Sequence, residues 1–187
     1  MDQKDWLSIV TEEYKTARQE SFEAGNNAQS ILKFGVATIG IVISTGLNLW
    51  EKKPIPDFVF LIFNPIFCYL ILTIWIGEFA RRIRVGHFIT QEIEQKVNRQ
   101  FQNFPSAITF ETWIRIPDKQ GKARLFKWNR YATITLFLIT ALCSIAVGNY
   151  SIVETISLYN LFIIDGLELI VFLGVVIFNY SVGKKLN

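Results

Sequence analysis

The chain alternates between long apolar stretches and segments that hold nearly all of its charge. Its apolar runs cover residues 31–49, 58–79, 131–147 and 158–182. A helix needs about 20 apolar residues to cross about 30 Å of hydrocarbon, and the third run lies at the short end of that range. The pattern therefore predicts an all-α integral membrane protein with four transmembrane helices.

The connections between the runs indicate two helical hairpins. Residues 51–57 contain two prolines between the first and second runs, so these spans are expected to turn back antiparallel over residues 31–79. Residues 148–157 are short and polar and are expected to join the third and fourth spans over residues 131–182. Residues 183–187 would form a short tail.

The first thirty residues predict an amphipathic helix. One face repeats at helical spacing and consists of Trp6, Leu7, Val10, Tyr14 and Ala17. No proline occurs between residues 1 and 50, so this helix is expected to continue into the first span. Two interpretations of its apolar face stay open: it lies on the inner leaflet of the membrane, or it forms a stalk against another subunit.

The second span is also expected to extend as a helix, up to Phe101 and with a bend at Gly86. Beyond it, Pro105 and Pro117 break helices, and residues 118–121 indicate a turn, so residues 102–129 are expected to be irregular. The segment 80–130 is the one polar part large enough to receive a signal. It is too small for an enzyme domain with a core of its own.

Composition and charge placement give the expected topology. Of 187 residues 51% are hydrophobic, the mean hydropathy is +0.30 and the net charge is +3. If both termini are cytoplasmic, all but two of the nineteen Lys and Arg lie on the cytoplasmic side, the exceptions being Lys52 and Lys53. Basic loops favour the cytoplasm, so we expect a multi-pass protein of a bacterial inner membrane with both termini inside.

Two acidic residues within the fourth apolar run are the strongest functional signal. Asp165 and Glu168 are three residues apart and so share a helix face, which continues through Phe172, Val175 and Asn179. Charge in hydrocarbon is costly and marks ion paths or wet cavities, so Asp165, Glu168 and Asn179 are candidate pore or ion-binding residues. Two alternatives remain: the acids are interfacial, or they bond to another span and serve packing.

The first three spans contain two further kinds of polar feature. Asn64 and Pro65 predict a kink that could act as a gating hinge, with the Asn64 side chain capping the carbonyl that proline leaves free. Small and polar residues also recur every four positions, a pattern that favours close helix packing. These stripes, expected to face each other, are Gly40, Ser44 and Asn48 in the first span and Thr140, Ser144 and Gly148 in the third.

Charged residues gather just after the second span. Glu78 is followed by Arg81, Arg82 and Arg84, which positive-inside anchoring explains and which are also candidates for coupling to a cytoplasmic trigger. Arginine recognises phosphate well, so a phosphate pocket is the competing interpretation. It would be joined by Lys119, Lys122, Arg124 and Lys127, although no glycine-rich phosphate loop supports it.

The sequence gives little sign of catalysis or metal binding. Cys68 and Cys143 lie within apolar runs, His87 stands alone, and no CxxC, HExxH or GxSxG motif occurs. We therefore expect no enzyme activity, no catalytic residues, no cofactor and no metal. Direct binding to nucleic acid is not expected either.

Several short segments resemble a family of small uncharacterised bacterial four-span membrane proteins. The matching segments are residues 13–20, Trp75 with residues 83–86, 88–89 and 92, and residues 110–113. Where the family has Gly-Trp-Glu, this chain has Thr109, Phe110 and Glu111. The resemblance implies an integral membrane protein with a cytoplasmic insert. In size and topology the chain is also similar to four-transmembrane effectors of anti-phage defence systems, which disrupt the membrane when triggered.

These observations leave three hypotheses for function. The first is a small homo-oligomeric channel or membrane-permeabilising effector in bacterial defence, gated through its cytoplasmic region by a cytosolic protein or small molecule at residues 80–130. The second is a membrane anchor or scaffold that recruits a cytosolic partner. The third is a proton-coupled transporter that uses the acidic pair.

Overall fold

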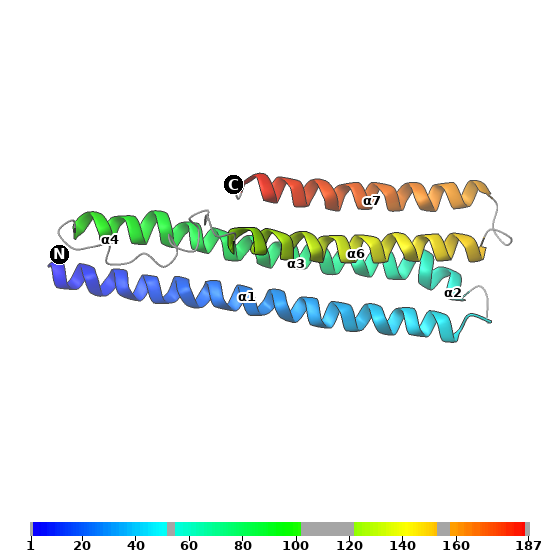
Figure 1. The fold of residues 1–187 in the computed structure, drawn as a ribbon, viewed down its shortest axis with the longest axis horizontal. Coiled ribbons are helices and arrows are strands. Elements are labelled where there is room, and N and C mark those ends of the chain that lie inside the picture. The colour runs from blue at the N-terminus through cyan, green and yellow to red at the C-terminus, as the bar shows by residue number, and fades with distance from the viewer. Residues whose placement is uncertain (1, 52–54, 102–121, 153–157, 186–187) are drawn as a thin grey trace. The chain divides into compact units, whose positions relative to one another are not determined.

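Every element in the described part of the chain is helical. The computed structural model describes residues 2–51, 55–101, 122–152 and 158–185 (Figure 1). The elements are α1 (Gln3–Asn48), α2 (Ile55–Phe58), the π-helix η1 (Val59–Phe63), α3 (Asn64–Phe88), the π-helix η2 (Ile89–Glu94), α4 (Gln95–Gln100), α6 (Lys122–Ile152) and α7 (Leu158–Lys185). The all-α prediction is confirmed.

Four of these helical stretches are long and apolar enough to cross a membrane. They are Lys4–Asn48, Val59–Gln100, Asn129–Ile152 and Phe162–Ser181. Each overlaps one of the four runs seen in the sequence, so the chain is a multi-pass membrane protein. The sidedness of its segments stays a prediction.

The helices extend further than the apolar runs predict. As expected, α1 passes without a break from the N-terminal segment into the first span, and helix continues beyond the second span to Gln100. The predicted loops at residues 102–129 and 148–157 are shorter than expected. Helix α6 already begins at Lys122 and continues through Gly148 to Ile152. Apolarity marks the membrane-spanning part of a helix and not its ends. The expected breaks at Pro105, Pro117 and residues 118–121 lie outside the described residues.

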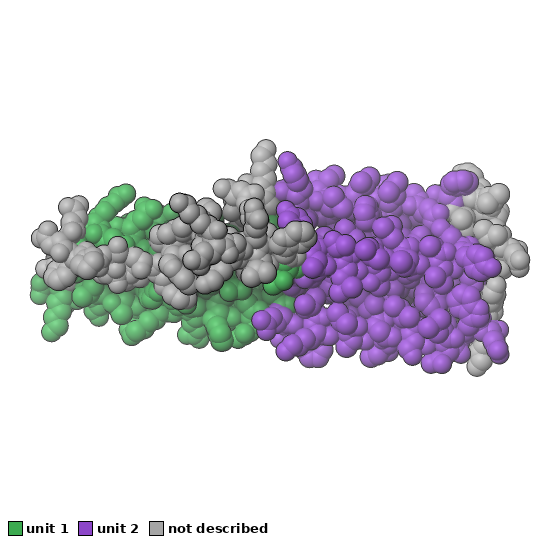
Figure 2. Space-filling model, viewed as in Figure 1, with its two compact units in different colours: residues 1–28, 77–130, 186 green, residues 29–76, 131–185, 187 purple. Residues whose placement is uncertain are grey.

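The chain divides into two compact units (Figure 2). Unit 1 comprises residues 1–28 and 77–130, and unit 2 comprises residues 29–76 and 131–185. Helices α1 and α3 each contribute one part to either unit.

Unit 1 is built on an apolar seam between α1 and the continuation of α3. Ala17 of α1 packs with Ile89, Ile93 and Val97 of η2 and α4. The partly buried residues around them are Trp6, Val10, Tyr14, Val85 and Phe101. The N-terminal face therefore packs against the same chain. Leu7 of the same face is exposed, and contact of this face with the leaflet or with another subunit stays a prediction.

In unit 2, α3 supplies most of the buried surface. Cys68, Leu72 and Ile76 are buried along one of its faces. Ile71 of α3 lies against Gly35 of α1, and Phe60 of η1 lies against Gly46, so glycines allow α1 to approach closely. The outward face of α7 is apolar and exposed, as expected for a surface that contacts lipid.

Candidate functional site

The acidic stripe of α7 faces the interior of unit 2. Glu168 and Val175 are buried, and Asp165, Phe172 and Asn179 are half-buried, whereas Leu167, Leu169 and Ile170 beside them are exposed. The helical spacing read from the sequence thus describes the packed face of α7.

Asp165 is held by the third span. Asn149 of α6 donates through Nδ2 to both carboxylate oxygens of Asp165, at 3.0 and 3.1 Å. Interhelical bonds of this kind link membrane helices. This contact agrees with the interpretation that Asp165 bonds to another span, and it gives Asp165 a neutral partner.

Glu168 has no such partner among the described residues. Its side chain is 9% exposed, and neither carboxylate oxygen accepts a hydrogen bond. Phe172, one turn along α7, meets the ring of Tyr69 of α3 edge-on with centroids 6.5 Å apart. A buried carboxylate without a hydrogen-bond donor is costly and calls for an explanation.

Pro65 alters the backbone hydrogen bonding of the helical turn that precedes it. In η1 the Asn64 N–H bonds to the Val59 carbonyl, five residues back, and Pro65 has no N–H to offer. The Phe60 carbonyl therefore lacks its usual donor, and Ser144 of α6 supplies one through its hydroxyl at 2.6 Å. Proline thus produces a π-helical turn, and an interhelical bond satisfies the carbonyl that it leaves free.

The predicted capping role of Asn64 is wrong. Its side chain is fully buried, and neither its oxygen nor its nitrogen has a hydrogen-bond partner within the described part of the chain. Ser144 takes that role from another helix. A hinge at Asn64 and Pro65 stays a prediction.

The two small-residue stripes behave differently. Gly148 lies so close to η1 that a Cβ would come within 2.8 Å of the Leu61 backbone nitrogen, so the stripe in α6 packs tightly. In α1, Gly40 has open space around it, and Ser44 and Asn48 are exposed. The expectation that the stripes face each other is therefore wrong, because α1 approaches its neighbours through Gly35 and Gly46.

The charged cluster after the second span lies in unit 1. Arg81 donates through Nε to Glu20 of α1 at 3.1 Å, and its guanidinium lies 3.7 Å from the carboxylate of Glu78. The guanidinium of Arg82 lies against Gly25 of α1. Arg81 and Arg84 also line an open groove of about 630 Å³. Its other lining residues are Glu13, Thr16, Ala17, Glu20, Val85 and Phe88.

The groove is mixed in charge, which weakens the phosphate interpretation. Two carboxylates face the same space as the two guanidinium groups and would repel an anion. The additional basic residues proposed for a phosphate pocket, Lys119, Lys122, Arg124 and Lys127, are not among the described side chains. Coupling of this cluster to a trigger stays a prediction.

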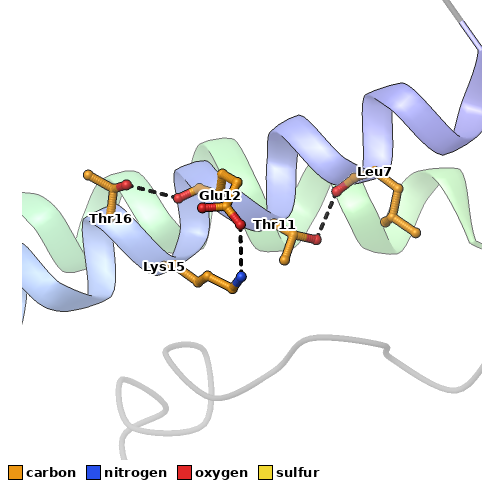
Figure 3. Close-up of polar contacts among 5 residues, drawn as sticks. All are labelled: Leu7, Thr11, Glu12, Lys15 and Thr16. Atoms are coloured by element: carbon orange, nitrogen blue, oxygen red, sulfur yellow. Dashed lines mark hydrogen bonds and ion pairs between the residues drawn. The ribbon is translucent and has the colours of Figure 1, made fainter.

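Nearer the N-terminus of α1, the polar contacts link residues within one or two helical turns. Lys15 pairs with Glu12 at 2.8 Å, while the hydroxyls of Thr11 and Thr16 bond to the carbonyls of Leu7 and Glu12 (Figure 3). These contacts stay within one exposed helix face and form no site.

The described ranges contain no large cluster of His, Cys, Asp and Glu side chains. There, no group of three or more His, Cys, Asp or Glu side chains comes together. Cys68 is buried and Cys143 exposed, and neither forms a disulfide.

Two residues at the acidic stripe were not singled out from the sequence. Asn149 donates to Asp165, and the ring of Tyr69 packs against Phe172 of the stripe. Asn149 lay in a predicted loop, and Tyr69 looked like an ordinary apolar residue. A polar residue inside or next to each neighbouring span was the available signal.

Comparison of the chain with protein-family models, with curated proteins and with solved structures gives no match. The family resemblance suggested by short sequence segments is therefore not supported by a family identification. The structure itself supports the architecture of a four-span membrane protein.

Proposed function

We propose that this chain is a small membrane channel whose cation path runs along the inner face of α7. One observation carries the proposal: the Glu168 carboxylate lies inside a membrane-spanning unit, is 9% exposed, and has no hydrogen-bond partner among the described residues. Ionisable residues placed in this way are typical of ion paths. Asp165, one turn away, adds a second negative charge to the same face.

The geometry favours a path within the chain over a ring of carboxylates around an oligomer axis. Asp165 bonds to Asn149 of α6, and Glu168 is buried, so both acids turn toward helices of their own subunit. A homo-oligomer remains part of the proposal, because four helices leave little room for a wide pore. If this channel opened only in response to a trigger, it would act as a membrane-permeabilising effector.

Bacterial membrane potential on induction tests the proposal. The parent chain is expected to depolarise cells, and the Asp165→Asn/Glu168→Gln variant is expected to leave the potential unchanged at equal membrane abundance. Glu12→Gln is the matched control, since it removes an exposed carboxylate of unit 1. Depolarisation by the double variant equal to that of the parent would show that the acids do not line the path.

The groove of unit 1 favours a second candidate, a membrane anchor that recruits a cytosolic partner. Charges of both signs around an apolar floor suit a polar protein segment. Stoichiometric copurification of a soluble protein, lost in Arg84→Glu and without any conductance, would support this role over the channel.

A further inference from the structure

Four polar side chains from three helices meet on the inner face of α7. Asn149 of α6 bonds to Asp165, Asp165 and Glu168 stand one turn apart on α7, and the ring of Tyr69 of α3 lies against Phe172, one turn beyond Glu168, with centroids 6.5 Å apart. The four side chains therefore gather along the same stretch of α7. Unit 2 contains all of them.

The oxygen atoms of this cluster are short of partners. Both carboxylate oxygens of Glu168, the hydroxyl of Tyr69 and Oδ1 of Asn149 are buried and make no hydrogen bond to any described residue. Tyr69 is only 4% exposed, yet its hydroxyl has no hydrogen-bond partner among the described residues. Packing alone would be served equally well by phenylalanine at this position.

Buried oxygens of this kind require a positive or donating group. Leaving them bare costs free energy for each atom, and two carboxylates one turn apart repel each other. Asn149 cannot relieve the charge, because its amide is neutral and Nδ2 is already used on Asp165. A cation that binds all four side chains would satisfy the free oxygens and the negative charge together.

We infer that Tyr69, Asn149, Asp165 and Glu168 form a binding site for a hard cation, such as an alkali or alkaline-earth ion. All atoms that the four side chains leave free are oxygens, the ligands that such ions prefer, and the cluster offers no nitrogen or sulfur ligand to a softer metal. Two carboxylates with neutral oxygens suit either a divalent ion or a monovalent ion. The inference rests on the proposed function in treating this face as part of the ion path.

Thermal unfolding of the purified full-length chain tests binding without requiring conduction. Unfolding is followed by Trp fluorescence in lipid nanodiscs at constant pH and ionic strength, in separate titrations with Na⁺, K⁺, Ca²⁺ and Mg²⁺ that replace N-methyl-D-glucamine. Binding to the folded state alone raises the unfolding midpoint saturably, by about 5–10 °C at about a hundredfold excess over half-saturation. The ion that raises the unfolding midpoint at the lowest concentration shows whether the site prefers alkali or alkaline-earth ions.

The variants separate a site from a general salt effect. Tyr69→Phe removes one oxygen at nearly constant shape and is expected to raise the half-saturating concentration about tenfold, and Glu168→Gln about a hundredfold. Glu92→Gln, which removes an exposed carboxylate of unit 1, is expected to leave it unchanged. If Glu168→Gln does not fold, Tyr69→Phe alone carries the test.

The outcomes distinguish this inference from the proposed function. Absence of a saturable rise with all four ions, or a rise that Tyr69→Phe leaves unchanged, overturns the cation site. Saturable binding in a chain that never depolarises membranes would keep the site and refute the channel. Depolarisation that depends on the acids, without equilibrium binding, would keep the channel and refute the site.

Discussion

In unit 1 ionised side chains pair at the surface above an apolar seam, whereas in unit 2 two carboxylates lie on the inward face of α7 beside neutral groups. Such pairs in unit 1 include Arg81 with Glu20, Lys15 with Glu12, and Lys96 with Glu92, all partly or largely exposed to solvent. In unit 2 Asp165 accepts from the amide of Asn149, and Glu168 has no hydrogen-bond partner among the described residues. Exposed pairs contribute little to stability, and buried unpaired charge costs much. The exposed pairs of unit 1 therefore cost little to retain, whereas the inward carboxylates of unit 2 call for an explanation.

The largest expected effect tests whether the apolar seam stabilises unit 1. Ile93 is almost fully buried between α1 and its neighbours, so Ile93→Ala should destabilise unit 1 by about 2–5 kcal/mol. Hydrogen exchange of residues 3–28 should accelerate accordingly. Ile9→Ala makes the same chemical change at an exposed position of α1 and should have little effect. Equal acceleration in both variants would contradict the assignment of the seam.

The next effect concerns close helix contact in unit 2. Gly148→Ala places a Cβ about where the Leu61 backbone lies, and this overpacking should cost about 1–3 kcal/mol. Gly40→Ala, in open space on α1, should be neutral or slightly stabilising. Thermal unfolding of both variants in the same lipid measures the contrast. A neutral Gly148→Ala would mean that α6 does not approach η1 this closely.

A smaller effect is expected at the proline-freed carbonyl. Ser144→Ala removes the donor to the Phe60 carbonyl and should cost about 1 kcal/mol, the usual size of an interhelical hydrogen bond in a membrane. Pro65→Ala restores a backbone N–H, so Ser144→Ala should cost less in that background. A double-mutant cycle by thermal unfolding measures this coupling. If the stability losses of the two single variants simply add in the double variant, the Ser144 bond does not depend on Pro65.

The smallest effect is predicted for a surface ion pair. Glu20→Gln removes the partner of Arg81, and because both side chains are more than a third exposed the loss should stay below about 1 kcal/mol. Salt screens such pairs, so the difference from the parent should shrink at high ionic strength. Hydrogen exchange of unit 1 at low and high salt is the measurement. A loss above about 2 kcal/mol would place this pair among the main stabilising contacts.

The sequence predicted the number and approximate position of the spans because apolar length is a direct physical requirement of a bilayer. It also predicted the stripe of α7, since helical spacing fixes which residues share a face. Helix ends were misplaced, as at Lys122 and Ile152, because polar residues continue a helix as readily as apolar ones. Partners across helices, such as Asn149 for Asp165 and Ser144 for Phe60, depend on helix rotation and register, which no single span encodes.

The most direct test of the account is the reversal potential of the purified chain in planar bilayers under a salt gradient. A path lined by Asp165 and Glu168 predicts a current that reverses near the cation equilibrium potential, with cation preference lost in the Asp165→Asn/Glu168→Gln variant. The Glu12→Gln control should reverse where the parent does. An unchanged cation preference in the double variant would contradict the claim that these two carboxylates select the ion.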